Sequence, residues 1–196
     1  MADAATIPAP RLGSIEGRHA GTPLAAALPA APATRVVLRA GEEARPALEA
    51  ALGLSLSGPI GTSDTSGPRS ALRLGPDEWL LIEEEVGEEG GDAFRTPVLA
   101  DLAGVEALHA AVDVSHRNAG ILVTGPRAAD ALEHGCPRDL ALDAFPIGAC
   151  ARTLLGKCEV VLWRGKADAF RVEVWRSFAP YAMDFLSEAC RDASLG

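Results

Sequence analysis

The stretch Val112-Asp-Val-Ser-His-Arg-Asn-Ala-Gly-Ile-Leu-Val-Thr124 runs into Gly125-Pro126, and these residues indicate the local fold most directly. Apolar, β-branched residues predict a strand on each side of the charged turn at 115–117, the second over Ala119–Thr124. The proline fits the first position of a helix, which we expect Gly135 to close. The stretch therefore predicts strand, short charged loop, strand and helix.

The remainder of the chain shows the same order of elements twice. Each half is expected to contain a strand, a helix, a hairpin and a second helix, which is the ferredoxin-like order. In the first half these are Thr34–Ala40, Glu42–Leu52, the pair Ala71–Leu74 and Trp79–Ile82, and Thr96–Ala110. In the second half they are Ala119–Thr124, the helix from Pro126, the pair Cys150–Leu155 and Cys158–Trp163 around Gly156-Lys157, a further strand Ala169–Arg176, and a last helix capped by Ser177 with Phe178, Tyr181, Phe185 and Leu186 on one side. The sequence thus predicts an α+β fold of duplicated split βαβ halves with antiparallel sheets.

Domain boundaries follow from a change in composition near residue 33. Residues 1–33 contain eleven Ala, five Pro and three Gly. The repeated Pro forbids a continuous helix, and the segment offers little to bury. We expect a flexible tail there, or an arm that becomes ordered on a partner. Residues 34–196 are expected to form one domain with pseudo-repeats at about 34–115 and 116–192. The loop 55–70, which precedes the first hairpin, is expected to lack regular structure.

Composition excludes several classes of function. The 196 residues are 48% apolar, enough for a core, and carry 18 basic and 27 acidic residues, a net charge of −9 that argues against nucleic-acid binding. Much of the negative charge lies in Glu83–Asp92, which reads as a solvated turn or a docking surface for a basic partner. No apolar run is long enough to span a membrane, and no signal peptide is recognisable, so a cytoplasmic location is expected. The cysteines Cys136, Cys150, Cys158 and Cys190 have neither zinc-site nor disulfide-framework spacing and are expected to be reduced and mostly buried.

Two pairs of residues suggest chemistry, and each has a structural alternative. Asp113 could orient His116 for acid–base work, or it could bond the backbone of its own turn. His134 beside Cys136 could activate a thiol, or His134 and Gly135 could end a helix. No glycine-rich phosphate loop or dinucleotide-binding motif is present. We therefore assign no catalytic, cofactor-binding or metal-binding residue in this chain.

A partner interface is the sharper expectation. Strand alternation places Arg171, Glu173 and Trp175 on one sheet face, and an odd-length turn through Lys166 would place Trp163 with them. Trp and Arg are enriched at binding hot spots. Either this face contacts a partner or a second layer of the same chain covers it. The candidate interface residues are Trp163, Arg171, Trp175, Arg176, His116 and Arg117.

Two blocks of sequence carry a family resemblance. Asp113-Val-Ser-His116 with Thr124-Gly-Pro126 resembles the signature of the aminomethyltransferase (glycine-cleavage T-protein) folate-binding fold. Phe145–Lys157, with Val174–Phe178, makes the chain similar to the family of gamma subunits of heterotetrameric sarcosine oxidase, over about residues 20–190. The resemblance implies a complex that oxidatively demethylates sarcosine, with FAD, FMN, NAD, tetrahydrofolate and zinc in alpha, beta and delta partner subunits.

The chain also departs from the catalytic members of the folate-binding fold. The hairpin Leu154–Val160, where those enzymes place a catalytic Asp, has none, and Glu159 is the nearest carboxylate. The Gly-Cys-Tyr-x-Gly-Gln motif of related proteins is also absent. The resemblance therefore implies a non-catalytic structural subunit. Two alternatives stay open: a stand-alone folate-dependent one-carbon transferase using Asp113 or Glu159, and a scaffold of another complex.

Overall fold

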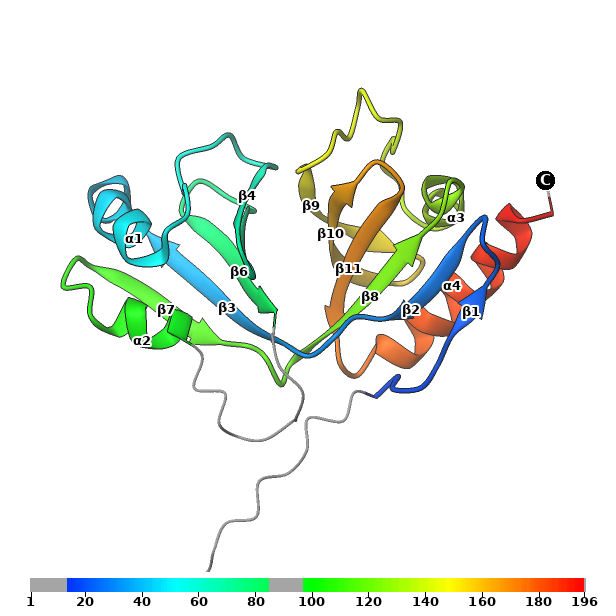
Figure 1. Cartoon of the computed structure of the whole chain (residues 1–196), viewed down its shortest axis with the longest axis horizontal. Coiled ribbons are helices and arrows are strands. Elements are labelled where there is room, and N and C mark those ends of the chain that lie inside the picture. The colour runs from blue at the N-terminus through cyan, green and yellow to red at the C-terminus, as the bar shows by residue number, and fades with distance from the viewer. Residues whose placement is uncertain (1–13, 85–96, 196) are drawn as a thin grey trace, which may run out of the picture.

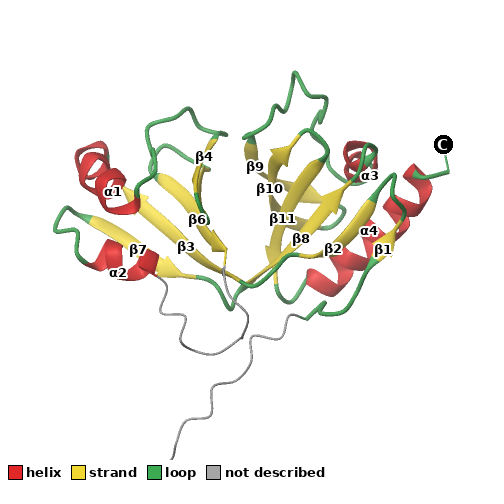
Figure 2. Cartoon of the chain, in the orientation of Figure 1, coloured by secondary structure: helices red, strands yellow, loops and turns green. Residues whose placement is uncertain are grey.

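Two antiparallel β-sheets lie next to one another, and helices cover the outer side of each (Figure 1). The computed structural model describes residues 14–84 and 97–195. Figure 2 shows the sheets converging at the lower end, where the chain passes between them. The α+β class with antiparallel sheets is as the sequence predicts.

The first sheet has the strand order β4-β5-β6-β3-β7, and the second has the order β1-β2-β8-β11-β10-β9. The first consists of β3 (Ala33–Ala40), β4 (Ser63–Ser66), β5 (Arg69–Arg73), β6 (Glu78–Glu84) and β7 (His109–Asp113), with α1 (Arg45–Leu52) after the 3-10 turn η1 (Glu42–Ala44), and α2 (Pro97–Ala103). The second consists of β1 (Ala20–Gly21), β2 (Ala26–Pro29), β8 (Asn118–Thr124), β9 (Cys150–Leu155), β10 (Cys158–Lys166) and β11 (Ala169–Trp175), with α3 (Ala128–Glu133) and α4 (Ala179–Ala193).

The duplication is visible in the strand order. In the first sheet β5-β6-β3-β7 is the order of a split βαβ unit, because β6 separates β3 from the strand that follows helix α1. The second sheet repeats this as β10-β11-β8-β2; the first sheet adds the edge strand β4, and the second adds β9 at one edge and β1 at the other. The loop predicted at 55–70 therefore contains β4 and the start of β5.

The N-terminal segment corrects the predicted tail. Residues 1–13 lie outside the described residues, but β2 pairs with β8 from Ala26↔Thr124 to Pro29↔Ile121 and completes the second sheet. Ala25 and Ala27 are fully buried. The prediction failed because Ala and Pro have low strand propensity. The strand forms because the space between this sheet and α4 accepts only small side chains. The second repeat thus takes its fourth strand from the N-terminal segment and not from the end of the chain.

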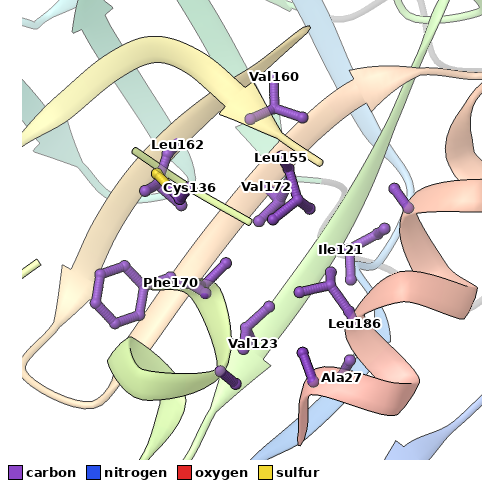
Figure 3. Packing of buried hydrophobic residues seen from close by; sticks show 14 of the residues in the cluster. Ala27, Ile121, Val123, Cys136, Leu155, Val160, Leu162, Phe170, Val172 and Leu186 are labelled. Atoms are coloured by element: carbon purple, nitrogen blue, oxygen red, sulfur yellow. The ribbon is translucent and has the colours of Figure 1, made fainter. Parts of the chain in front are cut away.

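Three hydrophobic clusters stabilise the arrangement. One joins the first sheet to α1 and α2, one joins the second sheet to α3 and α4, and one lies between the two sheets. Figure 3 shows the second of these, where Ile121 and Val123 of β8 lie close to Leu186 of α4 and to Ala27. All four cysteines are buried and free, as predicted. Burial raises the pKa of Cys150 to about 12 and that of Cys190 to about 11, so both stay protonated near neutral pH.

Helix ends differ from the predictions in two places. The helix expected over Thr96–Ala110 ends at Ala103, and Leu108, expected on its buried side, is 91% exposed before β7. The last helix begins at Ala179 with Phe178 as its N-cap, and no side chain caps it, so the predicted Ser177 cap is wrong. Its buried side is formed by small and flexible residues, because the sheet lies close: Ala182, Met183, Leu186, Ala189, Cys190 and Ala193. Within residues 14–84 and 97–195, no helix combines the length and apolar character needed to cross a membrane.

Gly135 has a role that the sequence did not reveal. It was expected to close helix α3, but His134 is the C-cap, and Gly135 does not have the positive φ that is common for a glycine at a helix end. Its carbonyl accepts a hydrogen bond from Gly156 N–H at 2.9 Å. A Cβ atom there would lie 2.8 Å from that nitrogen and would also overlap the ring of Phe185. The position therefore requires glycine for close packing between α3, the β9–β10 turn and α4.

Gly135→Ala is expected to lower the free energy of unfolding by about 1–3 kcal/mol, since the backbone of the turn and the Phe185 ring must both move. Chemical denaturation at neutral pH measures the difference. Gly165→Ala is the matched control, because a Cβ at that position meets no atom within 4 Å. Equal stabilities of the two variants would contradict the packing argument.

Candidate functional site

A concave cleft between the inner faces of the two sheets is the candidate site. Its floor is the hydrophobic cluster between the sheets, and its volume accessible to water is about 50 Å³. Small-molecule sites usually have volumes of about 300–1,000 Å³. The cleft is lined by Val37, Leu74, Glu78, Leu80, Val114, Arg117, Asn118, Arg152, Glu159, Val160, Val161, Glu173 and Trp175.

Strand register explains which side chains reach the cleft. In the β10–β11 pair, Trp163 faces Arg171 and Val161 faces Glu173, with an irregularity between Arg164 and Lys166. Paired residues share a face in an antiparallel sheet, so Trp163 and Trp175 do lie on the same face. Trp163 Nε1–H donates to Ser63 Oγ at 2.9 Å, which joins it to β4 of the other sheet. The alternative that a second layer of the same chain covers this face is therefore correct for Trp163.

A buried ionic network joins the sheets beneath the cleft. Glu173 of β11 accepts from Arg35 Nε of β3 at 2.5 Å and from Arg171 Nε at 2.7 Å. Arg171 Nη1 also contacts Glu84 Oε1 at 2.8 Å. Burial by itself would raise the pKa of Glu173, but the two guanidinium charges outweigh burial and hold the pKa below its ordinary value. Glu173 is therefore an anion that neutralises two buried cations, and it is not available as a general base.

The network requires a glycine on the neighbouring strand. Gly120 of β8 lies opposite Glu173 in the register. A Cβ at Gly120 would lie 2.9 Å from Glu173 Oε1 and 3.0 Å from Arg35 Nη2. The absence of a side chain at this position makes room for the carboxylate and the guanidinium together.

The carboxylates that sequence analysis considered for catalysis are both engaged. Asp113 Oδ1 accepts from the backbone N–H of Ser115 at 2.8 Å and from its hydroxyl at 2.5 Å, so the turn-forming alternative is correct. Glu159 pairs with Arg152 at 3.2 Å, and Arg152 also contacts Glu78 of the opposite sheet at 2.5 Å. The two ion pairs of Arg152 therefore connect the two sheets beside the cleft.

The second candidate pair is also structural. His134 Nδ1 lies 2.8 Å from the Asp130 carbonyl, one turn earlier in α3, and His134 is the C-cap of that helix. Cys136 is buried, and its sulfur lies 3.8 Å from the hydroxyl of Thr153. The helix-end alternative is correct for His134. Among the described residues, no three His, Cys, Asp or Glu side chains come together as metal ligands would.

The six predicted interface residues divide into two groups. Trp163 is partly buried and Arg171 is buried in the ionic network with Glu173, so neither is a surface residue of this chain. His116, Arg117, Trp175 and Arg176 are exposed and lie together, since the N–H of Arg176 donates to the Arg117 carbonyl at 2.7 Å. Sequence analysis missed a further member, Phe178, because helical spacing assigned it to a buried stripe. Its ring centroid lies 6.2 Å from that of Trp175, and 46% of the residue is exposed.

Comparison with known proteins identifies the family. A family model described as the sarcosine oxidase, gamma subunit family matches residues 40–192. Sarcosine oxidase subunit gamma from Corynebacterium sp. (strain U-96) is 32% identical over 168 residues, which are 82% of this chain and 77% of that protein. Sarcosine oxidase subunit gamma from Arthrobacter sp. is 31% identical over 160 residues, which are 80% of this chain and 75% of that protein. The chain belongs to the sarcosine oxidase gamma subunit family.

Solved structures agree with this assignment. A chain of the heterotetrameric sarcosine oxidase from Corynebacterium sp. U-96, in complex with pyrrole 2-carboxylate, superposes with a TM-score of 0.76 and 28% identity, covering 92% of this chain and 91% of that one. The glycine cleavage system aminomethyltransferase T from Bartonella henselae superposes with a TM-score of 0.59 and 15% identity, covering 85% of this chain and 48% of that one. The second match shows the fold alone. The resemblance inferred from the Asp113–His116 and Phe145–Lys157 blocks is thus confirmed.

Glu173→Gln is expected to lower the free energy of unfolding at pH 7 by about 3 kcal/mol or more, because it leaves two buried guanidinium groups without their anion. The folded-state pKa of Glu173 is depressed, so its contribution exists above the ordinary carboxyl pKa and is lost as the pH falls through the folded-state value. The difference between wild type and variant should therefore shrink below about pH 4. Denaturation curves from pH 7 to pH 3 measure it.

Glu159→Gln is the matched control for this measurement. The Glu159 side chain is 52% exposed in its ion pair with Arg152, so its loss should cost less than about 1 kcal/mol. A pH-independent difference for Glu173→Gln, or one no larger than that of Glu159→Gln, would contradict the role of the buried anion.

Proposed function

We propose that this protein is the gamma subunit of a heterotetrameric sarcosine oxidase and that it has no active site of its own. Membership of the gamma subunit family supports the subunit role. One observation carries the non-catalytic part: the interior of the folate-type fold is closed by the ionic network around Glu173 and by apolar side chains. The cleft of about 50 Å³ has no room for a pterin or an isoalloxazine ring.

The chemistry of the complex then resides in other subunits. In this proposal the complex demethylates sarcosine oxidatively to glycine, forming hydrogen peroxide and 5,10-methylenetetrahydrofolate. FAD, FMN, NAD, tetrahydrofolate and zinc are assigned to alpha, beta and delta subunits, and the complex to the cytoplasm. Within residues 14–84 and 97–195 no cluster of His, Cys, Asp or Glu suits zinc and the cleft is too small for a flavin or a pterin, so no step of the reaction is derived through these groups. Its contribution is to support partner subunits through its surface.

The alternative of a stand-alone folate-dependent transferase requires a carboxylate poised beside the folate. The two candidates are already engaged: Asp113 in the turn with Ser115, and Glu159 in the ion pair with Arg152. A general base must lie within hydrogen-bonding reach of the proton it removes. Neither carboxylate meets this requirement without breaking contacts that the fold uses. The remaining alternative, a scaffold of another complex, differs only in the identity of the partners.

Purification tests the proposal directly. The chain expressed alone is expected to show no flavin absorbance and no tetrahydrofolate binding at micromolar concentration. Co-expressed with the other three subunits of a sarcosine oxidase, it should co-purify with them in a stable complex. Flavin spectra, calorimetric titration with tetrahydrofolate and subunit stoichiometry provide the measurements. Folate binding by the isolated chain, or failure to co-purify, would overturn the proposal.

The double variant Asp113→Asn with Glu159→Gln separates the transferase alternative from the proposal. In the assembled complex we expect the rate of methylenetetrahydrofolate formation to remain within about twofold of wild type, since neither group acts as a proton acceptor. A loss of tenfold or more with intact assembly would favour the transferase. Circular dichroism and subunit stoichiometry control for folding and assembly.

A further inference from the structure

The exposed aromatic side chains are concentrated at one place on the surface. The whole chain has five Phe, three Trp and one Tyr. Among the described residues, the three large aromatics with substantial exposure are Trp175 at 43%, Phe178 at 46% and Tyr181 at 37%. They lie within seven consecutive residues, between the end of β11 and the first turn of α4. Burial of large aromatics is strongly favourable, so a cluster that remains exposed marks a binding surface.

Arg117 completes this cluster and fixes its shape. Its guanidinium carbon lies 4.2 Å from the centroid of the Trp175 ring, which is a close cation–π arrangement. Its carbonyl accepts the Arg176 backbone N–H at 2.7 Å, which ties the turn after β7 to the end of β11. We call Arg117, Trp175 and Phe178 the aromatic rim. The arginine is held in position before any partner arrives, so little conformational entropy remains to be lost on binding.

The charge of Arg117 distinguishes it from the other arginines beside the cleft. Arg35, Arg39, Arg152 and Arg171 each pair with at least one carboxylate. Within the described part of the chain, no carboxylate lies within ion-pair distance of Arg117, which is exposed and stacks on the Trp175 ring. A guanidinium presents a planar fork that matches a carboxylate. The partner that Arg117 lacks is therefore a negatively charged group.

The charge distribution of the chain points to the same partner chemistry. Residues 113–176 contain nine basic and eight acidic residues, a net of +1, whereas the chain as a whole has −9. The aromatic rim lies in this less acidic part, with His116 and Arg176 exposed next to it. Electrostatic complementarity between patches steers partners together and excludes wrong ones. The rim therefore favours an acidic segment over the basic or neutral surface that the rest of this chain would attract.

We propose that the aromatic rim is the anchor for an acidic segment of a partner subunit, in which an Asp or Glu carboxylate pairs with Arg117 and an adjoining apolar side chain packs against the exposed sides of Trp175 and Phe178. This inference rests on the proposed subunit role and adds the place and the chemistry of the contact. Arg117 and Trp175 also line the cleft, whose volume of about 50 Å³ suits one inserted side chain or a few water molecules. The cleft is thus a socket for part of a partner and not a metabolite site.

The test uses the complete complex, with the other three subunits of a sarcosine oxidase co-expressed and one of them affinity-tagged. The readout is the amount of this chain retained after washing, and its rate of dissociation. Arg117→Glu and Trp175→Ala are each expected to reduce retention at least tenfold, because hot-spot losses of this kind exceed the free energy of a tenfold change. Arg117→Lys should fall between wild type and Arg117→Glu, since it keeps the charge but loses the planar fork. Raising the salt concentration should speed dissociation of wild type more than that of Arg117→Ala.

Arg191→Glu is the matched control, an exposed arginine in the last turn of α4 and about 18 Å along the helix from its start. It should be retained like wild type, and circular dichroism of each isolated variant should show the native fold. Wild-type retention of both Arg117→Glu and Trp175→Ala would overturn the anchor while leaving the subunit role intact. Failure of the unmodified chain to co-purify would overturn the subunit role itself. Concentration-dependent self-association abolished by Arg117→Glu would instead identify a second copy of this chain as the occupant and would overturn the assignment to a partner subunit.

Discussion

The buried ion pair between Arg35 and Glu173 is the interaction on which the rest of the structure depends. It links β3 of the first sheet to β11 of the second and has almost no access to solvent on either side. Taking two charges out of water is costly, and only close geometry with further partners offsets that cost. Here Arg171 and the Ala33 carbonyl supply those partners. A shift of either strand by one residue would place each charge against apolar side chains, so the pair specifies the relative position of the sheets.

The same pair decides what the interior of the fold can do. A carboxylate held between two guanidinium groups occupies the region where the sheets approach, and Gly120 leaves room only for those groups. The space that remains is small and lies toward the edge. A fold shared with an aminomethyltransferase therefore does not imply a shared site, because function resides in particular side chains. In this chain the central polar residues hold the two halves together.

The sequence allowed the fold class, the duplication and most strands to be predicted, because β-branched runs and the Gly156-Lys157 turn act locally. It did not allow the N-terminal strand to be predicted. The Ala and Pro residues of β2 have low strand propensity, and their pairing with β8 is determined by a space that only the folded second sheet creates. At the site, strand parity left the face of Trp163 dependent on the length of the turn through Lys166, and the structure places it on the face of Trp175. The alternation of side chains along a strand does not show how deeply each side chain is buried. It therefore could not show that Trp163 binds Ser63 of the other sheet while Trp175 stays at the surface.

The path of the chain through the two sheets determines which residues meet at its surface. The chain forms β1 and β2 of the second sheet, crosses to the first sheet as β3, and returns through the turn between β7 and β8. Arg117 lies in that returning turn, just before β8, and Trp175 is the last residue of β11, the strand next to β8. Trp175 pairs with Asn118, the residue after Arg117, so the stacking of Arg117 on Trp175 is a contact between neighbouring strands of the second sheet. The register that places Arg117 beside Trp175 also places Gly120 opposite Glu173, so the surface rim and the buried ionic network depend on the same pairing of β8 with β11.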